Sequence, residues 1–99
     1  MESDETLMLN VRLGSRQAFE EVFARYREPI FAFFRRRVNG TELAEDLTQE
    51  TFLAVLRAAN RYEPRSTVRS YLFAIAFRLL LNGGNRNNIW RSYQTGSRR

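Results

Sequence analysis

Acidic and amide side chains recur at three- and four-residue spacing in the middle of this chain of 99 residues. On a helix with about 100° per residue, six side chains fall on one arc of about 100°: Glu42, Asp46, Gln49, Glu50, Leu53 and Arg57. This arc is either a solvated face that carries one exposed leucine or a docking face. In a docking face, the carboxylates would meet a basic partner around an aliphatic anchor. The spacing alone leaves both interpretations open.

A second group of candidate binding residues lies at 60–66, where arginines and a tyrosine surround Pro64. Guanidinium groups hold phosphates and aromatic rings stack on bases, so Arg61, Tyr62 and Arg65 suit single-stranded nucleic acid. Glu63 fits phosphate poorly, but its carboxylate can accept a hydrogen bond from a base amino group.

The helix pattern after this turn places Tyr71, Arg78 and Asn82 on one narrow strip. A ring, a guanidinium and an amide in a row suit base stacking and hydrogen bonding to nucleotides. The alternative is that Tyr71 packs at the margin of the core and Arg78 is solvated. The same helix is so apolar that it is either centrally buried or covered by a partner.

Four helices are expected to position these residues, because helical periodicity recurs and strand alternation is absent. The first is short, with Asp4 as its cap and Gly14 as its stop. The second begins after Ser15 and keeps its apolar period to Val38, with a kink near Pro29.

The third helix is expected to begin at a cap formed by Thr41 and to run to about Ala59. Ser66 or Thr67 then caps a fourth helix that ends near Asn82, because Gly83-Gly84 follows. The sequence therefore predicts an all-α fold, a compact bundle of three to four helices over 1–82. Residues 83–99 lack an apolar period and are expected to form a flexible tail or linker.

The charge is divided unevenly along the chain. All eleven acidic residues and nine of the sixteen arginines lie in 1–63, whereas 64–99 holds seven arginines and no acid. A basic second part suggests a polyanionic partner. Every cation is an arginine, the residue that suits bidentate phosphate contacts, although a compositional habit of the genome explains this equally well.

Several function classes are disfavoured by composition. The chain has no cysteine and no histidine, which removes disulfides, thiolate metal sites and the commonest general base. Carboxylates at 42–50 could in principle bind magnesium, but no nucleophile or phosphate loop accompanies them. No enzyme activity and no cofactor are therefore expected. No apolar run reaches membrane-spanning length, the acidic N-terminus lacks signal-peptide features, and a cytoplasmic location is expected.

Three segments resemble domain two of the extracytoplasmic-function (ECF) sigma factors, the small group of the bacterial sigma-70 family. They read GSRQAFEEVFARYREPIFAFFRRRV (14–38), AEDLTQETFLAVLRA (44–58) and RYEPRSTVRSYLFAIA (61–76). The likeness covers about residues 4–82, and it implies a domain of three to four helices.

In that family, an AEDL-x-QE helix docks on the clamp helices of the RNA polymerase β′ subunit. The matching residues here include Asp46, Gln49 and Glu50, which also lie on the acidic arc. The resemblance therefore favours the docking interpretation. The residues predicted to bind RNA polymerase are Glu42, Asp46, Gln49, Glu50 and Leu53.

The family also melts promoter DNA and captures the non-template strand of the −10 element with the loop and helix that follow the docking helix. A flipped base enters a loop pocket while arginines hold the phosphates. The resemblance implies these DNA-binding residues: Arg61, Tyr62, Arg65, Ser66, Arg69, Tyr71, Arg78 and Asn82.

The chain departs from the family pattern at three places. The family often has tryptophan at Tyr71, and it continues IARN-x-x-x-D where this chain has Phe77-Arg78 and then Asn82. A second, helix-turn-helix domain that reads the −35 element has no room in 99 residues, which suggests an isolated domain or a natural truncation. The alternative function is a sigma-like mimic that binds polymerase or an anti-sigma factor without promoter recognition. An anti-sigma factor is an expected partner in either case.

Overall fold

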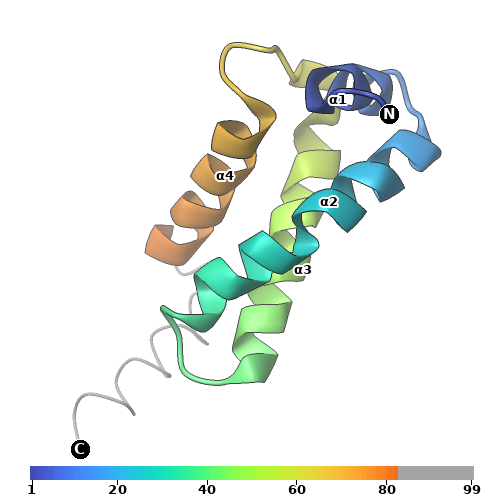
Figure 1. Cartoon of the computed structure of the whole chain (residues 1–99). Coiled ribbons are helices and arrows are strands. Elements are labelled where there is room, and N and C mark those ends of the chain that lie inside the picture. The colour runs from blue at the N-terminus through green and yellow to red at the C-terminus, as the bar shows by residue number, and fades with distance from the viewer. Residues whose placement is uncertain (83–99) are drawn as a thin grey trace, which may run out of the picture.

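Four α-helices and one short 3-10 turn form the fold in Figure 1, a computed structural model that describes residues 1–82. In chain order they are α1 (Asp4–Arg12), α2 (Arg16–Arg35), α3 (Thr41–Ala58), η1 (Ala59–Arg61) and α4 (Val68–Asn82). No strand occurs within these residues, so the predicted all-α class is confirmed. The predicted tail at 83–99 and the predicted helix stop at Gly83-Gly84 lie outside the described residues.

Hydroxyl side chains begin the first two helices. The Ser3 hydroxyl accepts a hydrogen bond of 3.1 Å from the backbone N–H of Thr6, so the predicted cap at Asp4 was wrong by one residue. Ser15 accepts at 3.1 Å from the N–H of Ala18, as predicted. Between the two helices, Gly14 adopts a φ of +98°. This left-handed conformation favours glycine and confirms Gly14 as the stop.

Helix α2 continues through Pro29 and ends at Arg35, the first residue of the basic run Arg35-Arg36-Arg37. The following helix, α3, has Gly40 as its N-cap, with a φ of 98° and no side-chain cap. The predicted cap at Thr41 was therefore wrong, because the sharp turn needs a positive φ that a glycine adopts without strain.

The cap of α4 agrees with the second of the two predicted candidates. The Thr67 hydroxyl accepts a hydrogen bond of 3.0 Å from the backbone N–H of Ser70, and it donates one of 3.0 Å to the Ser70 hydroxyl. The residue before α4 thus satisfies one of the free N–H groups at the start of the helix.

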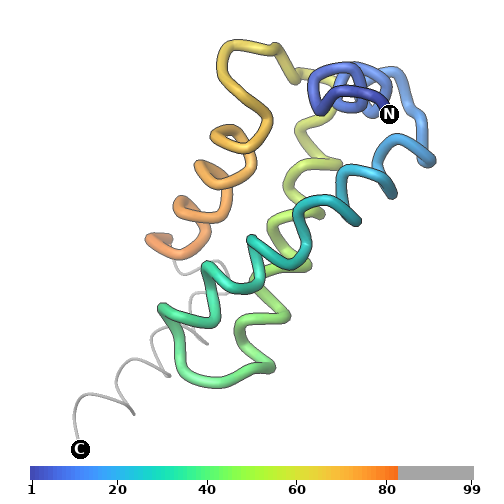
Figure 2. Tube along the Cα trace, in the orientation of Figure 1, coloured from blue at the N-terminus to red at the C-terminus, as the bar shows by residue number. Residues whose placement is uncertain are grey.

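The helices are arranged around an α2–α3 hairpin (Figures 1 and 2). Helix α4 packs on α3 and α2, whereas α1 lies across the end of the hairpin, where it contacts α2 and η1. The chain between η1 and α4 arches out at this same end of the molecule. The fold therefore brings the predicted nucleic-acid turn close to α1.

The core draws on all four helices. Its largest fully buried apolar side chains are Phe34, Met8, Ile30, Leu47, Leu72, Val22, Val55 and Val68. On α3, Phe52 and Thr48 are also buried. Neither belongs to the core side that helical spacing predicts, which consists of Leu43, Ala44, Leu47, Thr51, Ala54, Val55 and Ala58. The hydroxyls of Thr48 and Thr51 each donate 2.8 Å hydrogen bonds to the carbonyl four residues earlier, so their burial leaves no polar atom unpaired. No described helix is both long and apolar enough to cross a membrane.

Candidate functional site

The predicted acidic arc lies on the exposed side of α3. Glu42, Asp46 and Gln49 are exposed, Glu50 is half-buried, and Leu53 keeps 45% of its surface accessible. None of the ion pairs within residues 1–82 engages these carboxylates. Their charges are therefore unpaired within this part of the chain and face outward.

Leu56 extends this surface, and the sequence analysis did not include it. It is 45% exposed and lies just outside the 100° arc that was drawn on the wheel. Five exposed positions then alternate at spacings of four and three residues: Glu42, Asp46, Gln49, Leu53 and Leu56. We call this row the α3 seam. The spacing is that of the contact positions of a coiled coil, and it was visible in the sequence.

The tyrosine in the predicted nucleic-acid turn points inward. Tyr62 is only 2% exposed, and its ring meets the ring of Tyr71 edge to face with centroids 5.1 Å apart. Its hydroxyl has no hydrogen-bond partner among the described residues. Burial raises the pKa of Tyr62, with smaller contributions from Glu5 and Tyr71. In this conformation the Tyr62 ring is not available to stack on a base, whereas Tyr71 is half-buried.

The turn and the start of α4 enclose a hollow of about 390 Å³, which we call the loop hollow. Its lining residues are Ala58, Arg61, Tyr62, Glu63, Arg65, Ser66 and Tyr71. Five of the eight predicted DNA-binding residues therefore come together around one space. Arg65 already forms an exposed ion pair with Glu63, at 2.6 Å between Nη2 and Oε1.

The other three predicted DNA-binding residues lie elsewhere on α4. The Arg69 guanidinium lies over the Phe73 ring at 4.9 Å, and that ring packs edge to face on Phe33 of α2 at 5.6 Å. Arg78 and Asn82 are exposed further along the helix. Since Arg78 follows Tyr71 by seven residues, it lies about 10 Å along the helix axis from the loop hollow. These side chains can form an outer track but not the wall of the hollow.

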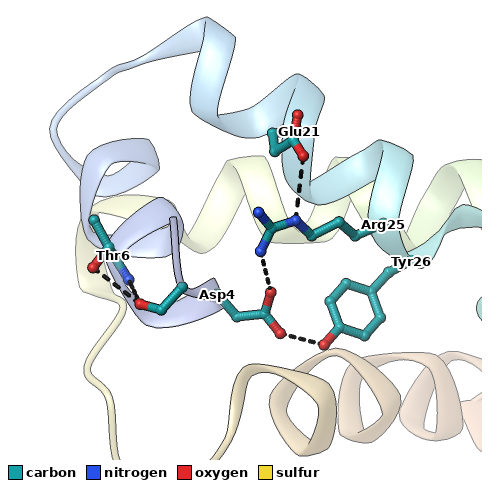
Figure 3. Close-up of polar contacts among 6 residues, drawn as sticks. Asp4, Thr6, Glu21, Arg25 and Tyr26 are labelled. Carbon is teal, nitrogen blue, oxygen red and sulfur yellow. Dashed lines mark hydrogen bonds and ion pairs between the residues drawn. The ribbon is translucent and has the colours of Figure 1, made fainter. Parts of the chain in front are cut away.

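A polar cluster that the sequence analysis missed holds α1 against α2 (Figure 3). The Asp4 carboxylate accepts a hydrogen bond from Arg25 Nη1 at 2.8 Å and another from the Tyr26 hydroxyl. Glu21 pairs with the same arginine at 3.3 Å. No spacing rule links Asp4 to residues more than twenty positions away, so only the folded chain reveals this cluster.

The cluster shifts the pKa values of its members. Burial acts to raise the pKa of Asp4, but the hydrogen bonds from Tyr26 and Arg25 and the arginine charge outweigh it, so the pKa falls below its usual value of 3.8. Burial and the bond to Asp4 raise the pKa of Tyr26 to about 12. Both shifts favour the ionised carboxylate and the neutral phenol, the pair that holds the two helices together.

The acidic side chains of the described region do not form a metal site. Within residues 1–82, no group of three or more potential ligands is placed to hold one metal ion. The carboxylates of α3 are therefore better described as a charged surface.

Comparison with known proteins identifies the family of this helical domain. The family model for sigma-70 region 2 matches residues 22–88, which is more than half of the chain. The chain belongs to the sigma-70 region 2 family. The predicted resemblance is confirmed, and the match covers the α3 seam and the loop hollow but begins after α1.

Curated relatives of this region 2 chain are sigma factors. The RNA polymerase sigma factor CarQ of Myxococcus xanthus is 44% identical over 69 residues, which are 70% of this chain and 40% of the relative. YlaC of Bacillus subtilis, also an RNA polymerase sigma factor, is 30% identical over 67 residues, covering 68% and 39%. The ECF RNA polymerase sigma factor SigC of Mycobacterium tuberculosis is 33% identical over 75 residues, covering 76% and 40%. The matched region spans about 40% of the length of these relatives.

Proposed function

We propose that this chain is the part of an ECF sigma factor that joins RNA polymerase to promoter DNA. The α3 seam docks on the β′ clamp helices, and the loop hollow with α4 holds the non-template strand of the −10 element. The observation that carries this proposal is the α3 seam, where unpaired acids and two exposed leucines follow coiled-coil spacing on a helix of the sigma-70 region 2 family.

The order of side chains along the seam supports docking on a helical partner. The acidic residues Glu42 and Asp46 stand at the N-terminal part of α3, and the leucines stand at its C-terminal part. The carboxylates would steer and orient a basic partner helix, whereas burial of Leu53 and Leu56 would supply the apolar anchor. A partner helix that lies along the seam would thus contact acidic residues near the N-terminus of α3 and leucines near its C-terminus.

The chemistry of the loop hollow supports DNA capture. A base turned out of the strand would stack on the half-buried ring of Tyr71, a contact worth about 1–3 kcal/mol. Arg61 and Arg65 would bind the adjacent phosphates. Because Arg65 is paired with Glu63 in the free protein, the phosphate must replace that carboxylate. Arg69, Arg78 and Asn82 extend the contact along α4, and the role needs no catalytic group and no cofactor.

The docking half of the proposal is tested with charge reversal. In a pull-down with a fragment of the β′ clamp helices, Asp46→Arg and Glu50→Arg should each abolish binding, because a cation would face a basic partner. Glu28→Arg is the matched control, since it reverses an exposed acid on α2 that is paired only with Arg27 among the described residues. Normal β′ binding by both Asp46→Arg and Glu50→Arg would refute the docking assignment.

The DNA half is tested by fluorescence anisotropy with a labelled non-template −10 oligonucleotide. Tyr71→Ala should weaken binding about tenfold or more. The affinity of the unaltered protein should fall with salt at a log–log slope of about −0.7 for each phosphate contact. A protein that binds β′ but gives no response to the oligonucleotide would instead be a sigma-like mimic.

A further inference from the structure

The last residue of α1 contacts the backbone of the loop hollow. Arg12 donates a hydrogen bond of 3.0 Å from Nη1 to the carbonyl oxygen of Tyr62, across 50 positions of sequence. The bond is partly buried, and it involves a charged donor. Hydrogen bonds of this kind are stronger than those between neutral groups.

Tyr62 is the point at which the loop leaves the helical part of the chain. Its N–H donates at 3.1 Å to the carbonyl of Ala59, and its own backbone is extended, with φ −62° and ψ 133°. The ring is buried against Tyr71. Tyr62 is therefore restrained at three groups: its amide is bonded to Ala59, its carbonyl to Arg12, and its ring packs on Tyr71.

The loop beyond Tyr62 depends on its two ends. Residues 63–67 are exposed, and the chain is buried again only at Val68, after the Thr67 cap of α4. An exposed loop with few buried contacts is easily deformed. The placement of Glu63, Arg65 and Ser66 around the hollow thus rests on the anchors at Tyr62 and Thr67.

Helix α1 is itself fixed at its opposite end. The Asp4 carboxylate is bonded to Arg25 and Tyr26 of α2 (Figure 3). Helix α1 therefore connects α2 to the loop, with one polar anchor near each end. This helix precedes the residues 22–88 that match the sigma-70 region 2 family.

We propose that Arg12 is a positioning residue for nucleic-acid binding, which acts by holding the Tyr62 carbonyl so that the loop hollow is formed before a base arrives. The inference rests on the proposed DNA-binding function. In this proposal Arg12 acts through the hydrogen bond from its Nη1 to the Tyr62 carbonyl and not through a contact with the DNA. Preforming the hollow lowers the ordering cost of binding, so loss of Arg12 weakens capture of the strand without removing any contact to it.

The test compares Arg12→Ala with Arg16→Ala in the full chain. Both variants remove one positive charge, but Arg16 is an exposed residue with no hydrogen bond or ion pair from its side chain within residues 1–82. In anisotropy titrations with the non-template oligonucleotide, Arg12→Ala should bind about tenfold more weakly, or about 1.4 kcal/mol. Its log–log salt slope should equal that of the unaltered protein, since no phosphate contact is lost. Arg12→Lys keeps a cationic donor and should recover part of the affinity.

A second measurement reads the position of the loop without DNA. The nuclear Overhauser effect between the ring protons of Tyr62 and Tyr71 should weaken in Arg12→Ala and persist in Arg16→Ala. Circular dichroism and β′ binding should remain unchanged in both variants, which shows that the domain is folded.

The outcomes separate the two proposals. If the unaltered protein binds the oligonucleotide and Arg12→Ala binds it equally well, the positioning role is refuted while the DNA-binding function stands. A salt slope that falls by about 0.7 would overturn the inference in another way, because Arg12 would then contact a phosphate itself. If the unaltered protein does not bind the oligonucleotide, the proposed function fails, and the positioning role fails with it.

Discussion

The α3 seam and the loop hollow differ in how far their side chains are already bonded within the protein. The acids of the seam have no ion pair within residues 1–82, and its leucines are about half exposed. In the hollow, Tyr62 is buried and Arg65 is paired with Glu63. In the proposed function, the seam can therefore bind its partner without breaking an internal ion pair, whereas the hollow must exchange the Arg65–Glu63 pair for a contact with phosphate.

Two kinds of candidate binding residue can therefore be distinguished: those that are exposed and make no core contact, and those that also belong to the core. Leu53 can be altered without touching the core, because its side chain faces outward. Tyr62 belongs to the core and to the hollow at once, so a change there alters stability before it alters binding. Each of the following predictions tests whether the two surfaces are as separate as their contacts indicate.

The largest effect is expected at Tyr62. Tyr62→Ala removes a ring that is 2% exposed and packs on Tyr71, so the free energy of unfolding should fall by about 3–5 kcal/mol. Urea unfolding measures the change. Tyr62→Phe is the matched control: it keeps the ring and deletes a hydroxyl without a partner, and it should leave stability unchanged or slightly raised. A large loss in Tyr62→Phe would show that the hydroxyl is bonded after all.

An intermediate effect is expected at the anchor of α1. Asp4→Asn weakens the bonds to Arg25 and Tyr26 and should lower the free energy of unfolding by about 1–2 kcal/mol, as for other hydrogen bonds to a charged group. Binding to the oligonucleotide should weaken with it, whereas β′ binding by the folded protein should not change. Equal losses of both activities would mean that the two surfaces are coupled.

The loss of stability in Asp4→Asn should depend on pH. The pKa of Asp4 in the folded protein lies below the usual value of 3.8, so the unfolded chain takes up the proton first as the pH falls. The stabilising effect of the carboxylate is therefore fully present above that value and is lost as the pH falls through the lower, folded pKa. The stability difference between the unaltered protein and Asp4→Asn should be constant near neutral pH and should shrink below about pH 4.

The fold could be predicted because it depends on local signals. The apolar period indicated where the helices lie, and Ser15 and Thr67 marked the starts of two of them. Each of these two residues caps its helix through a bond to a backbone N–H three positions later. The cap of α3 was mistaken because Thr41 has the right chemistry, but the chain needs a positive φ at Gly40. Phe52 was left out of the core because a helical wheel gives only the direction of each side chain around the axis. It does not show how much of the helix surface the neighbouring helices cover.

The exposed face of α3 could also be predicted, because its residues lie on one helix and their directions follow from spacing alone; Leu56 was left out because it lies just outside the arc that was drawn. The loop hollow could not be predicted in the same way. Tyr62 was expected to face the nucleic acid, yet its ring packs on Tyr71 and its carbonyl accepts a hydrogen bond from Arg12, which lie nine and fifty positions away. Such contacts form only when separate helices pack, and the composition of a turn does not contain them.

The smallest effect is expected from freeing Arg65. Glu63→Gln removes the exposed partner at 2.6 Å and one negative charge near the strand, so oligonucleotide affinity should rise about two- to fivefold, in line with the small worth of surface ion pairs. Anisotropy at two salt concentrations measures the gain, which should shrink at the higher one. Glu28→Gln makes the same charge change on α2 and should have a smaller effect. A loss of affinity in Glu63→Gln would indicate that Glu63 accepts a bond from the base.

Pro29 interrupts the backbone hydrogen bonds in the middle of α2. Proline has no N–H, so the carbonyl of Arg25, four residues earlier, lacks its helical donor. The half before this break is tied to α1 through Asp4, and the half after it packs Phe33 against Phe73 of α4. In amide hydrogen exchange, the two halves should therefore open as separate units with different protection. The longest helix within residues 1–82 would then behave, on the timescale of exchange, as two short helices joined at Pro29.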